Sequence, residues 1–299
     1  MPLDSSKNKS KNKKIININN KTKFLEAWRA FKSNRLALIG LAASLALFAL
    51  AFGGSLAIPF DNAIKQNISQ RFTPPCLEHP LGTDGLGRDM LARMLHGAKV
   101  SLTMGFIPMA ASMLAGMFFG GIAVLLGGWV ENLIMRVCDI MTCIPAILLA
   151  LAMVAALGPG LGNVLVAITI ASVPDLTRYV RSVILGIAGL EYIEAARACG
   201  ASGGAIIVRH ILPNAMGPLL LGAVSNISGM IMAGAGLSYL GLGIQLPNPE
   251  WGAMLAESQS YFLRAPYLMV APGIAILVSV FAFNLAGDGL RDALDAKLR

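Results

Sequence analysis

Long uncharged apolar stretches are the feature of this sequence that most limits its fold. Residues 36–58 and 102–127 contain no Asp, Glu, Lys or Arg. A helix of about 20 apolar residues is long enough to cross a bilayer. The composition agrees, because 56% of the 299 residues are hydrophobic and 13% are charged, whereas soluble proteins average roughly 45–50% and 25%. These observations argue against a soluble enzyme and against a disordered scaffold.

The hydropathy pattern predicts an all-α polytopic membrane protein with six transmembrane helices. The fourth span is the shortest, because 163–173 reaches span length only if 158–162 contributes. A long inner loop, 174–214, is expected to follow it. The six expected spans are residues 36–58, 102–127, 134–157, 158–173, 216–240 and 266–286.

Positive charge is concentrated near the N-terminus. Residues 1–35 hold ten of the 24 Lys and Arg and two of the 16 acidic residues, which leaves 14 of each elsewhere. Basic residues favour the cytoplasmic side of a membrane, so both termini are expected in the cytoplasm. The outer residues 59–100 carry five bases against four acids, a weak exception. We expect a disordered basic tail (1–22), an N-terminal part with the first span and an extracytoplasmic loop (23–100), and a five-helix core (101–299).

The residues just before the first span have the pattern of an interfacial amphipathic helix. Large apolar side chains recur there at helical spacing, with basic side chains between them. An ordinary juxtamembrane segment is the alternative interpretation. The apolar residues are Phe24, Leu25, Trp28 and Phe31, and the basic ones are Lys23, Arg29, Lys32 and Arg35.

The second expected span carries a GxxxG pattern at Gly116 and Gly120. Small residues let helix backbones approach closely inside a membrane. The pattern therefore indicates dense helix packing, and packing within this chain explains it better than a dimer face.

The sequence lacks the motifs of the common catalytic and metal sites. It contains no HExxH or CxxC, and no phosphate-binding GxxxxGK[ST]. We therefore expect no catalytic, metal-binding or cofactor-binding residue, and ATP-driven transport would need a separate ATPase. Glu78, His79, Asp84 and Asp89 could form a metal site, but we favour a compact loop, because Pro and Gly punctuate the segment and no pair has ligand spacing on a helix.

Few ionisable residues fall inside the expected spans. Arg136 and Asp139 lie three residues apart near one end of the third span, where they could pair with each other or with Arg178 or Asp175. An interfacial ion pair explains them better than an ion pathway. Since no midspan acid and no internal repeat is evident, a stand-alone secondary transporter is a weaker hypothesis. A membrane scaffold for a peripheral enzyme is a third one.

The inner loop has the features of a compact helical protrusion. Residues 192–199 favour a helix, and Gly200 allows a sharp turn after it. Residues 205–211 favour a second short element, and Pro213 is expected to disrupt or kink it before the fifth span. Such a structure suits docking to another protein better than catalysis.

This loop, at about 189–214, resembles the EAA loop of ABC importer permeases. The pattern is Glu-Ala-Ala, three residues, Gly, nine residues, Ile, one residue and Leu-Pro, and here His210 stands at the Ile position. The run 209–214 looks like the form found in the dipeptide/oligopeptide/nickel branch. The matching residues are Glu194, Ala195, Ala196, Gly200, Leu212 and Pro213.

Four further stretches are similar to that branch, and the resemblance covers roughly residues 24–299. The segment 79–89 is expected either to face a binding protein or only to fold its loop. The segment 287–289 could simply cap the last span. The four stretches are 79–84 with 87–89, 237–243, 251–252 and 287–289.

The resemblance implies a type I ABC importer permease fold in the cytoplasmic membrane. The solute would be a di- or oligopeptide, with nickel or another small solute as the alternative. The implied partners are a homologous second permease, two cytoplasmic ATPases that bind ATP and Mg²⁺, an extracytoplasmic solute-binding protein and membrane lipid. The residues implied in coupling to the ATPase are Glu194, Ala195, Ala196, Gly200, His210, Leu212 and Pro213.

Overall fold

The computed structural model describes residues 28–29 and 31–295. The expected tail 1–22, and Phe24 and Leu25 of the expected amphipathic helix, lie outside the described residues. In the described part, every named element is a helix. The elements are α2 (Arg35–Phe48), η1 (Ala49–Gly54), α3 (Ser55–Ala57), α4 (Phe60–Ile64), η2 (Ile68–Gln70), α5 (Met90–Leu126), α6 (Gly128–Thr142), α7 (Ala146–Leu157), α8 (Leu161–Ala188), α9 (Glu191–Ala198), α10 (Gly203–Ile206), η3 (Ile207–Ile211), α11 (Leu212–Tyr239), α12 (Trp251–Ser258), η4 (Gln259–Tyr261) and α13 (Tyr267–Asp295).

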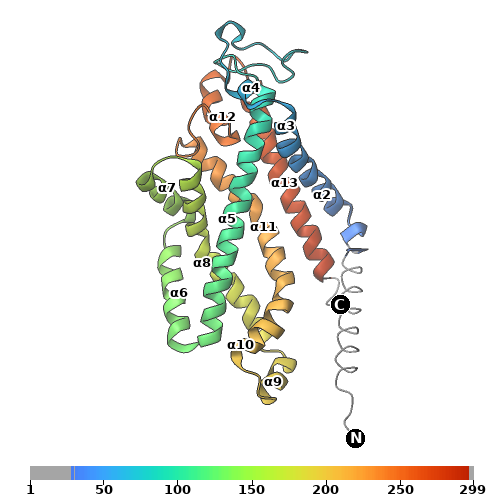
Figure 1. The fold of residues 1–299 in the computed structure, drawn as a ribbon, viewed down its shortest axis with the longest axis vertical. Coiled ribbons are helices and arrows are strands. Elements are labelled where there is room, and N and C mark those ends of the chain that lie inside the picture. Colours follow the sequence, from blue (N-terminus) through green and yellow to red (C-terminus); the bar gives the residue numbers. More distant parts are fainter. Residues whose placement is uncertain (1–27, 30, 296–299) are drawn as a thin grey trace.

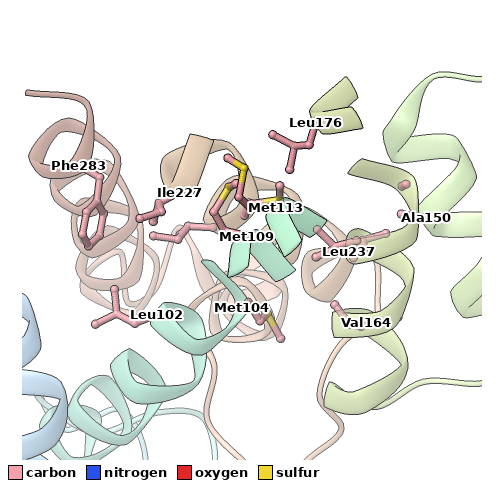
Figure 2. Close-up of a cluster of buried hydrophobic side chains, with 14 of the residues drawn as sticks. Leu102, Met104, Met109, Met113, Ala150, Val164, Leu176, Ile227, Leu237 and Phe283 are labelled. Carbon is pink, nitrogen blue, oxygen red and sulfur yellow. The ribbon is translucent and has the colours of Figure 1, made fainter. Parts of the chain in front are cut away.

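The long helices form an elongated bundle around α5 (Figure 1). Helix α5 packs against α8 and α11, and α13 packs against α11 and α2. Methionines of α5 fill much of the core, where Met104 and Met109 lie near Ile227 and Leu237 of α11 (Figure 2). Helix α4 and α12 lie at one end of the bundle, and α9 and α10 lie at the other (Figure 1).

The helices agree with the predicted membrane class. Four helical segments of the described part are long and apolar enough to cross a bilayer: Arg35–Ala57, Met90–Leu126, Gly203–Tyr239 and Tyr267–Ala293. The bent pair α6–α7 can count as a fifth. Helix α8 has 28 residues, about 42 Å at 1.5 Å per residue, although it is more polar. The predicted number of six is therefore approximate.

The third expected span, 134–157, is not one straight helix. The chain bends by 82° between α6 and α7. Pro145 is the N-cap of α7. Because proline lacks an N–H and restricts the residue before it, a helix running through Ile144 and Pro145 would lose a backbone bond and meet a steric clash.

The fourth expected span is part of a longer helix. Helix α8 continues through the buried Pro174 to Ala188, so the loop that was expected from residue 174 begins about 15 residues later. The polar residues after Pro174 stay helical because α6 supplies their partners. Arg178 Nη2 lies 2.6 Å from Asp139 Oδ1, and Arg181 Nε donates to Glu131 Oε1 at 2.7 Å. Asp139 thus pairs with Arg178, one of the partners predicted for Arg136 and Asp139.

Close approach between α5 and α8 explains the GxxxG pattern. A Cβ atom on Gly120 would lie 2.8 Å from the carbonyl oxygen of Thr177, and one on Gly116 would lie 2.9 Å from the carbonyl carbon of Leu176. Real Cβ atoms do not come so near to backbone atoms. The predicted role of the pattern in packing within the chain is confirmed.

Helix α13 meets α2 in a similar way near the end of the bundle. A Cβ atom on Gly40 would lie 2.6 Å from the backbone nitrogen of Ala286, and one on Gly289 would overlap the Cβ of Ala37. Since α13 continues to Asp295, the suggestion that 287–289 caps the last span is wrong. Gly287 and Gly289 lie inside this helix, where Gly289 allows α2 to pack closely and Gly287 faces Ser225 of α11.

The loop before α5 adopts the predicted compact turns. Asp84 Oδ1 accepts hydrogen bonds from the backbone N–H groups of Leu86 and Arg88, each at 2.9 Å. His79 Nδ1 lies 2.7 Å from Asp89 Oδ2, and Asp89 also caps α5. Within residues 28–29 and 31–295, no three His, Cys, Asp or Glu side chains are grouped to hold a metal ion.

Candidate functional site

Helix α9 is a short exposed helix at the end of the bundle opposite α12 (Figure 1). Of its eight residues, Ile193 alone is buried, with 0% of its surface exposed. This side chain joins the main core and holds the helix against the bundle. The remaining residues leave a polar and small-residue surface, formed by Glu191, Tyr192, Glu194, Ala195, Ala196, Arg197 and Ala198.

The C-terminus of α9 ends in a Schellman motif centred on Gly200. The backbone N–H of Ala201 donates to the carbonyl of Ala196 at 3.1 Å, and that of Gly200 donates to the carbonyl of Arg197 at 2.9 Å. Gly200 has φ +84°, a left-handed conformation that glycine adopts without steric cost. No neighbouring atom lies within 4 Å of the position a Cβ would take, so backbone conformation alone accounts for the glycine.

The second limb of the loop returns the chain to the membrane as one continuous helix. Ser202 caps α10, and its Oγ accepts from the N–H of Ala205 at 3.4 Å. The helix widens into the π turn η3 and continues into α11. Pro213 was expected to disrupt or kink this element, and the regular α-helix is interrupted by the π turn directly before it, although the helix stays continuous. A π turn before Pro213 accommodates a residue that cannot donate a hydrogen bond.

The two limbs are joined by a polar contact that the sequence analysis missed. Asn214 Nδ2 lies 3.2 Å from Tyr192 Oη and 2.6 Å from the carbonyl oxygen of His210. Tyr192 belongs to α9 and Asn214 to the first turn of α11. Both residues lie inside the EAA-like segment, but the pattern does not specify either side chain, so only their proximity in the fold identifies the contact.

The predicted coupling residues gather at this end of the molecule, on two limbs. Glu194, Ala195 and Gly200 are exposed on the α9 limb, and Pro213 is exposed on the α11 limb. Ala196, His210 and Leu212 are half-buried. The arrangement is a rigid knob with a charged, small-residue surface, attached directly to α8 and α11. It is suited to mechanical contact with another protein.

A buried ionic cluster lies at the opposite end and was not predicted. Arg88 Nη2 lies 2.5 Å from Glu257 Oε2, and Arg93 Nη2 lies 2.9 Å from Glu257 Oε1. Asp84 Oδ2 lies 2.6 Å from Arg88 Nε and 3.5 Å from Arg93 Nη1. The side chains of Arg88 and Arg93 are only 3% and 1% exposed. The cluster joins the loop before α5, α5 itself and α12.

Glu250 makes a second buried link at this end. Its carboxylate accepts hydrogen bonds from Ser101 Oγ at 2.8 Å and from the N–H groups of Gly252 and Ala253 at 2.9 and 2.8 Å. It therefore caps α12 and fastens it to α5. Burial raises the pKa of this carboxyl group, and the hydrogen bonds oppose the rise.

Trp251 is buried next to Glu250. It belongs to 251–252, one of the stretches that resemble the dipeptide/oligopeptide/nickel branch. Its indole Nε1 donates to the carbonyl of Met94 on α5 at 3.1 Å. This stretch of the sequence therefore holds α12 in place.

Comparisons with known proteins place the chain in a family. Residues 112–299 match the family model described as binding-protein-dependent transport system inner membrane component, and residues 22–75 match the N-terminal TM domain of oligopeptide transport permease C. The backbone matches a chain of the inward-facing MetNI methionine ABC transporter with a TM-score of 0.58 at 21% identity, over 68% of this chain and 97% of that chain.

Relatives with similar sequences extend over nearly the whole chain. The dipeptide transport system permease protein DppC of Alkalihalophilus pseudofirmus is 42% identical over 92% of this chain and 90% of its own length. The glutathione transport system permease protein GsiD of Pectobacterium atrosepticum is 41% identical over 93% of both chains. The di/tripeptide permease DppC of Pseudomonas aeruginosa is 42% identical over 92% of both. The chain therefore belongs to the family of binding-protein-dependent transport system inner membrane components, as a multi-pass membrane permease with the fold of an ABC importer subunit.

Proposed function

We propose that this permease carries di- or oligopeptides across the cytoplasmic membrane. Its relatives with more than 40% identity are named for dipeptides, di- and tripeptides, and glutathione, which is itself a tripeptide. The full-length correspondence with these permeases is the observation that supports a peptide solute over nickel. The partners would be a homologous second permease, two ATPases that bind ATP and Mg²⁺, and an extracytoplasmic solute-binding protein.

The knob formed by residues 189–214 is proposed as the contact with the ATPase. Glu194, Ala195, Ala196, Gly200, His210, Leu212 and Pro213 would form the coupling site. Three features support this proposal. The surface of α9 is exposed, Ile193 and the Gly200 turn fix its orientation, and the limbs continue directly into α8 and α11. A push on α9 would thus reach two long helices without passing through a flexible linker. The knob and both termini would then face the cytoplasm, with residues 59–89 and α12 outside.

The test measures peptide uptake and ATP hydrolysis together. The chain is reconstituted in proteoliposomes with its partner permease, ATPases and binding protein. Uptake of a labelled dipeptide is then compared with uptake of nickel ions from a nickel salt. ATP-dependent dipeptide uptake is the expected result. Uptake driven by an ion gradient without ATP or partners would show a secondary transporter, and nickel uptake alone would refute the peptide assignment.

The variant Gly200→Val tests the coupling site. Valine is strained at φ +84°, so the knob should change shape while the spans insert normally. We expect ATP hydrolysis to become uncoupled from uptake. Gly204→Ala is the matched control, because Gly204 lies in the same loop at an ordinary φ with open space around it. Wild-type uptake by Gly200→Val would contradict the proposal.

A further inference from the structure

An apolar groove of about 320 Å³ lies between α11, the N-terminal part of α2 and the C-terminal part of α13. Leu41 of α2 and Val224 of α11 line its sides, and α13 contributes several residues. Trp28 and Phe31 close one end. The full lining is Trp28, Phe31, Leu41, Val224, Ala286, Leu290 and Ala293. All seven side chains are apolar, and the volume is within the range of small-ligand sites.

The groove is a consequence of how the three helices pack. Glycines draw α2 tightly against α13 at Gly40 and Gly289. Ala286, at the Gly40 contact, and Ala293, about one turn beyond Gly289, present small side chains that leave space on the surface of α13. Residues 28–29 and 31–33 are helical. Within them, Phe31 is 7% exposed and packs against Ala37 and Ala293. The groove is therefore bordered by α2, α11 and α13, with Trp28 and Phe31 completing its lining.

One basic side chain contacts the apolar lining, and a second follows three residues later in the sequence. Lys32 and Arg35 are both exposed, and Arg35 is the first residue of the first span. The ammonium group of Lys32 lies 5.4 Å from the centre of the Trp28 ring, so one lining residue directly contacts a cation. Of the nearby acids, Asp292 accepts a hydrogen bond from Asn34 Nδ2 at 3.0 Å. An apolar slot beside two cations at a membrane boundary matches an acyl chain joined to an anionic headgroup.

We propose that this groove binds one acyl chain of an anionic phospholipid, whose headgroup is held by Lys32 and Arg35. A phospholipid supplies both halves of the site, because its chain can enter between α2 and α11 from the bilayer while its phosphate stays at the surface. Membrane-surface cations attract anionic lipids, and the aromatic ring of Trp28 suits the interface between chain and headgroup.

The experiment measures lipids retained by the assembled transporter. The complex is reconstituted in bilayers of equal parts phosphatidylglycerol and phosphatidylethanolamine, re-extracted in mild detergent, and analysed by native mass spectrometry. Wild type should retain phosphatidylglycerol in preference to phosphatidylethanolamine. Val224→Trp should fill the groove and abolish retention. Lys32→Gln with Arg35→Gln should keep lipid in the groove but lower the preference by roughly fivefold for each cation removed.

A matched control removes two exposed lysines at the opposite end of the bundle, with Lys65→Gln and Lys99→Gln. This control should retain lipid as wild type does. No preference in wild type, or unchanged retention in Val224→Trp, would overturn the proposal. If lipid is retained only in the double variant Phe24→Ser with Leu25→Ser, residues of this chain occupy the groove in the wild type. That result would also overturn the proposal. Because the readout is bound lipid, the outcome is independent of the transported solute.

Discussion

Tyr192 Oη lies 3.2 Å from Nδ2 of Asn214, so a side chain of α9 is joined to the first turn of α11. Asn214 in turn donates to the carbonyl oxygen of His210 in the π turn. The contact closes the knob into a loop whose two limbs move together. If α9 receives the push of an ATPase, this contact is one of the routes by which the push reaches α11.

Tyr192→Phe is therefore expected to weaken coupling without changing the fold. The phenyl ring keeps its packing, and one hydrogen bond of about 0.5–1.5 kcal/mol is lost. Peptide uptake per ATP hydrolysed should fall roughly twofold to tenfold in proteoliposomes. Tyr239→Phe, at the other end of α11, is the control and should behave as wild type. An unchanged ratio of uptake to hydrolysis in Tyr192→Phe would remove this contact from the coupling route.

Glu250→Gln is expected to change how stability depends on pH. Burial raises the pKa of this carboxyl group in the folded chain. The folded state then holds its proton at pH values where the unfolded state has released it, so the free energy of unfolding decreases as pH rises from the ordinary glutamate pKa through the raised one. A glutamine does not titrate and lacks this decrease.

The difference in melting temperature between Glu250→Gln and wild type should shift in favour of the variant as pH rises through that window. Melting of the purified chain in detergent, followed at a series of pH values, measures the shift. Glu78→Gln, at an exposed position of the outer loop, controls for general charge effects. A constant difference across the series would show that burial does not perturb this group.

The sequence predicted the helical class and the knob more accurately than the paths of individual helices. Apolar runs locate α2, α5, α11 and α13 because a bilayer requires continuous hydrophobic length. The same criterion failed for α8, since Arg178 and Arg181 are neutralised by acids on α6, which a scan of one segment cannot detect. Whether a segment with charged residues stays helical next to other helices depends on acidic or basic partners that lie far away in the sequence.

Local backbone chemistry explains the other successes and failures at the site. Gly200 was correctly placed after a helix because a left-handed cap depends on one residue type. Pro213 was expected to disrupt or kink a helix, but the form of the disruption, a π turn within a continuous helix, was not predicted. Glu257 gave no sign of its role, because its two arginine partners lie 169 and 164 residues away.

Glu257→Ala is expected to destabilise the chain strongly. Its carboxylate neutralises Arg88 and Arg93, whose side chains are 3% and 1% exposed. Removing one partner leaves buried charge uncompensated, at a cost of roughly 3–5 kcal/mol. The midpoint of thermal unfolding in detergent should drop by several degrees. Glu194→Ala, an exposed acid on α9, should leave the midpoint unchanged, and equal midpoints for both variants would mean that the cluster contributes little.

Gly120→Val should disrupt the contact between α5 and α8, whereas Gly121→Val should not. The two residues are adjacent on the same helix, so insertion and helix propensity are matched. A Cβ on Gly120 would lie 2.8 Å from the carbonyl oxygen of Thr177, and one on Gly121 would meet nothing within 4 Å. Forcing side-chain atoms into a packed interface costs roughly 1–3 kcal/mol. The yield of monodisperse protein in size-exclusion chromatography and its melting temperature should fall for Gly120→Val alone. Equal behaviour of the two variants would show that α5 and α8 do not rely on this close approach.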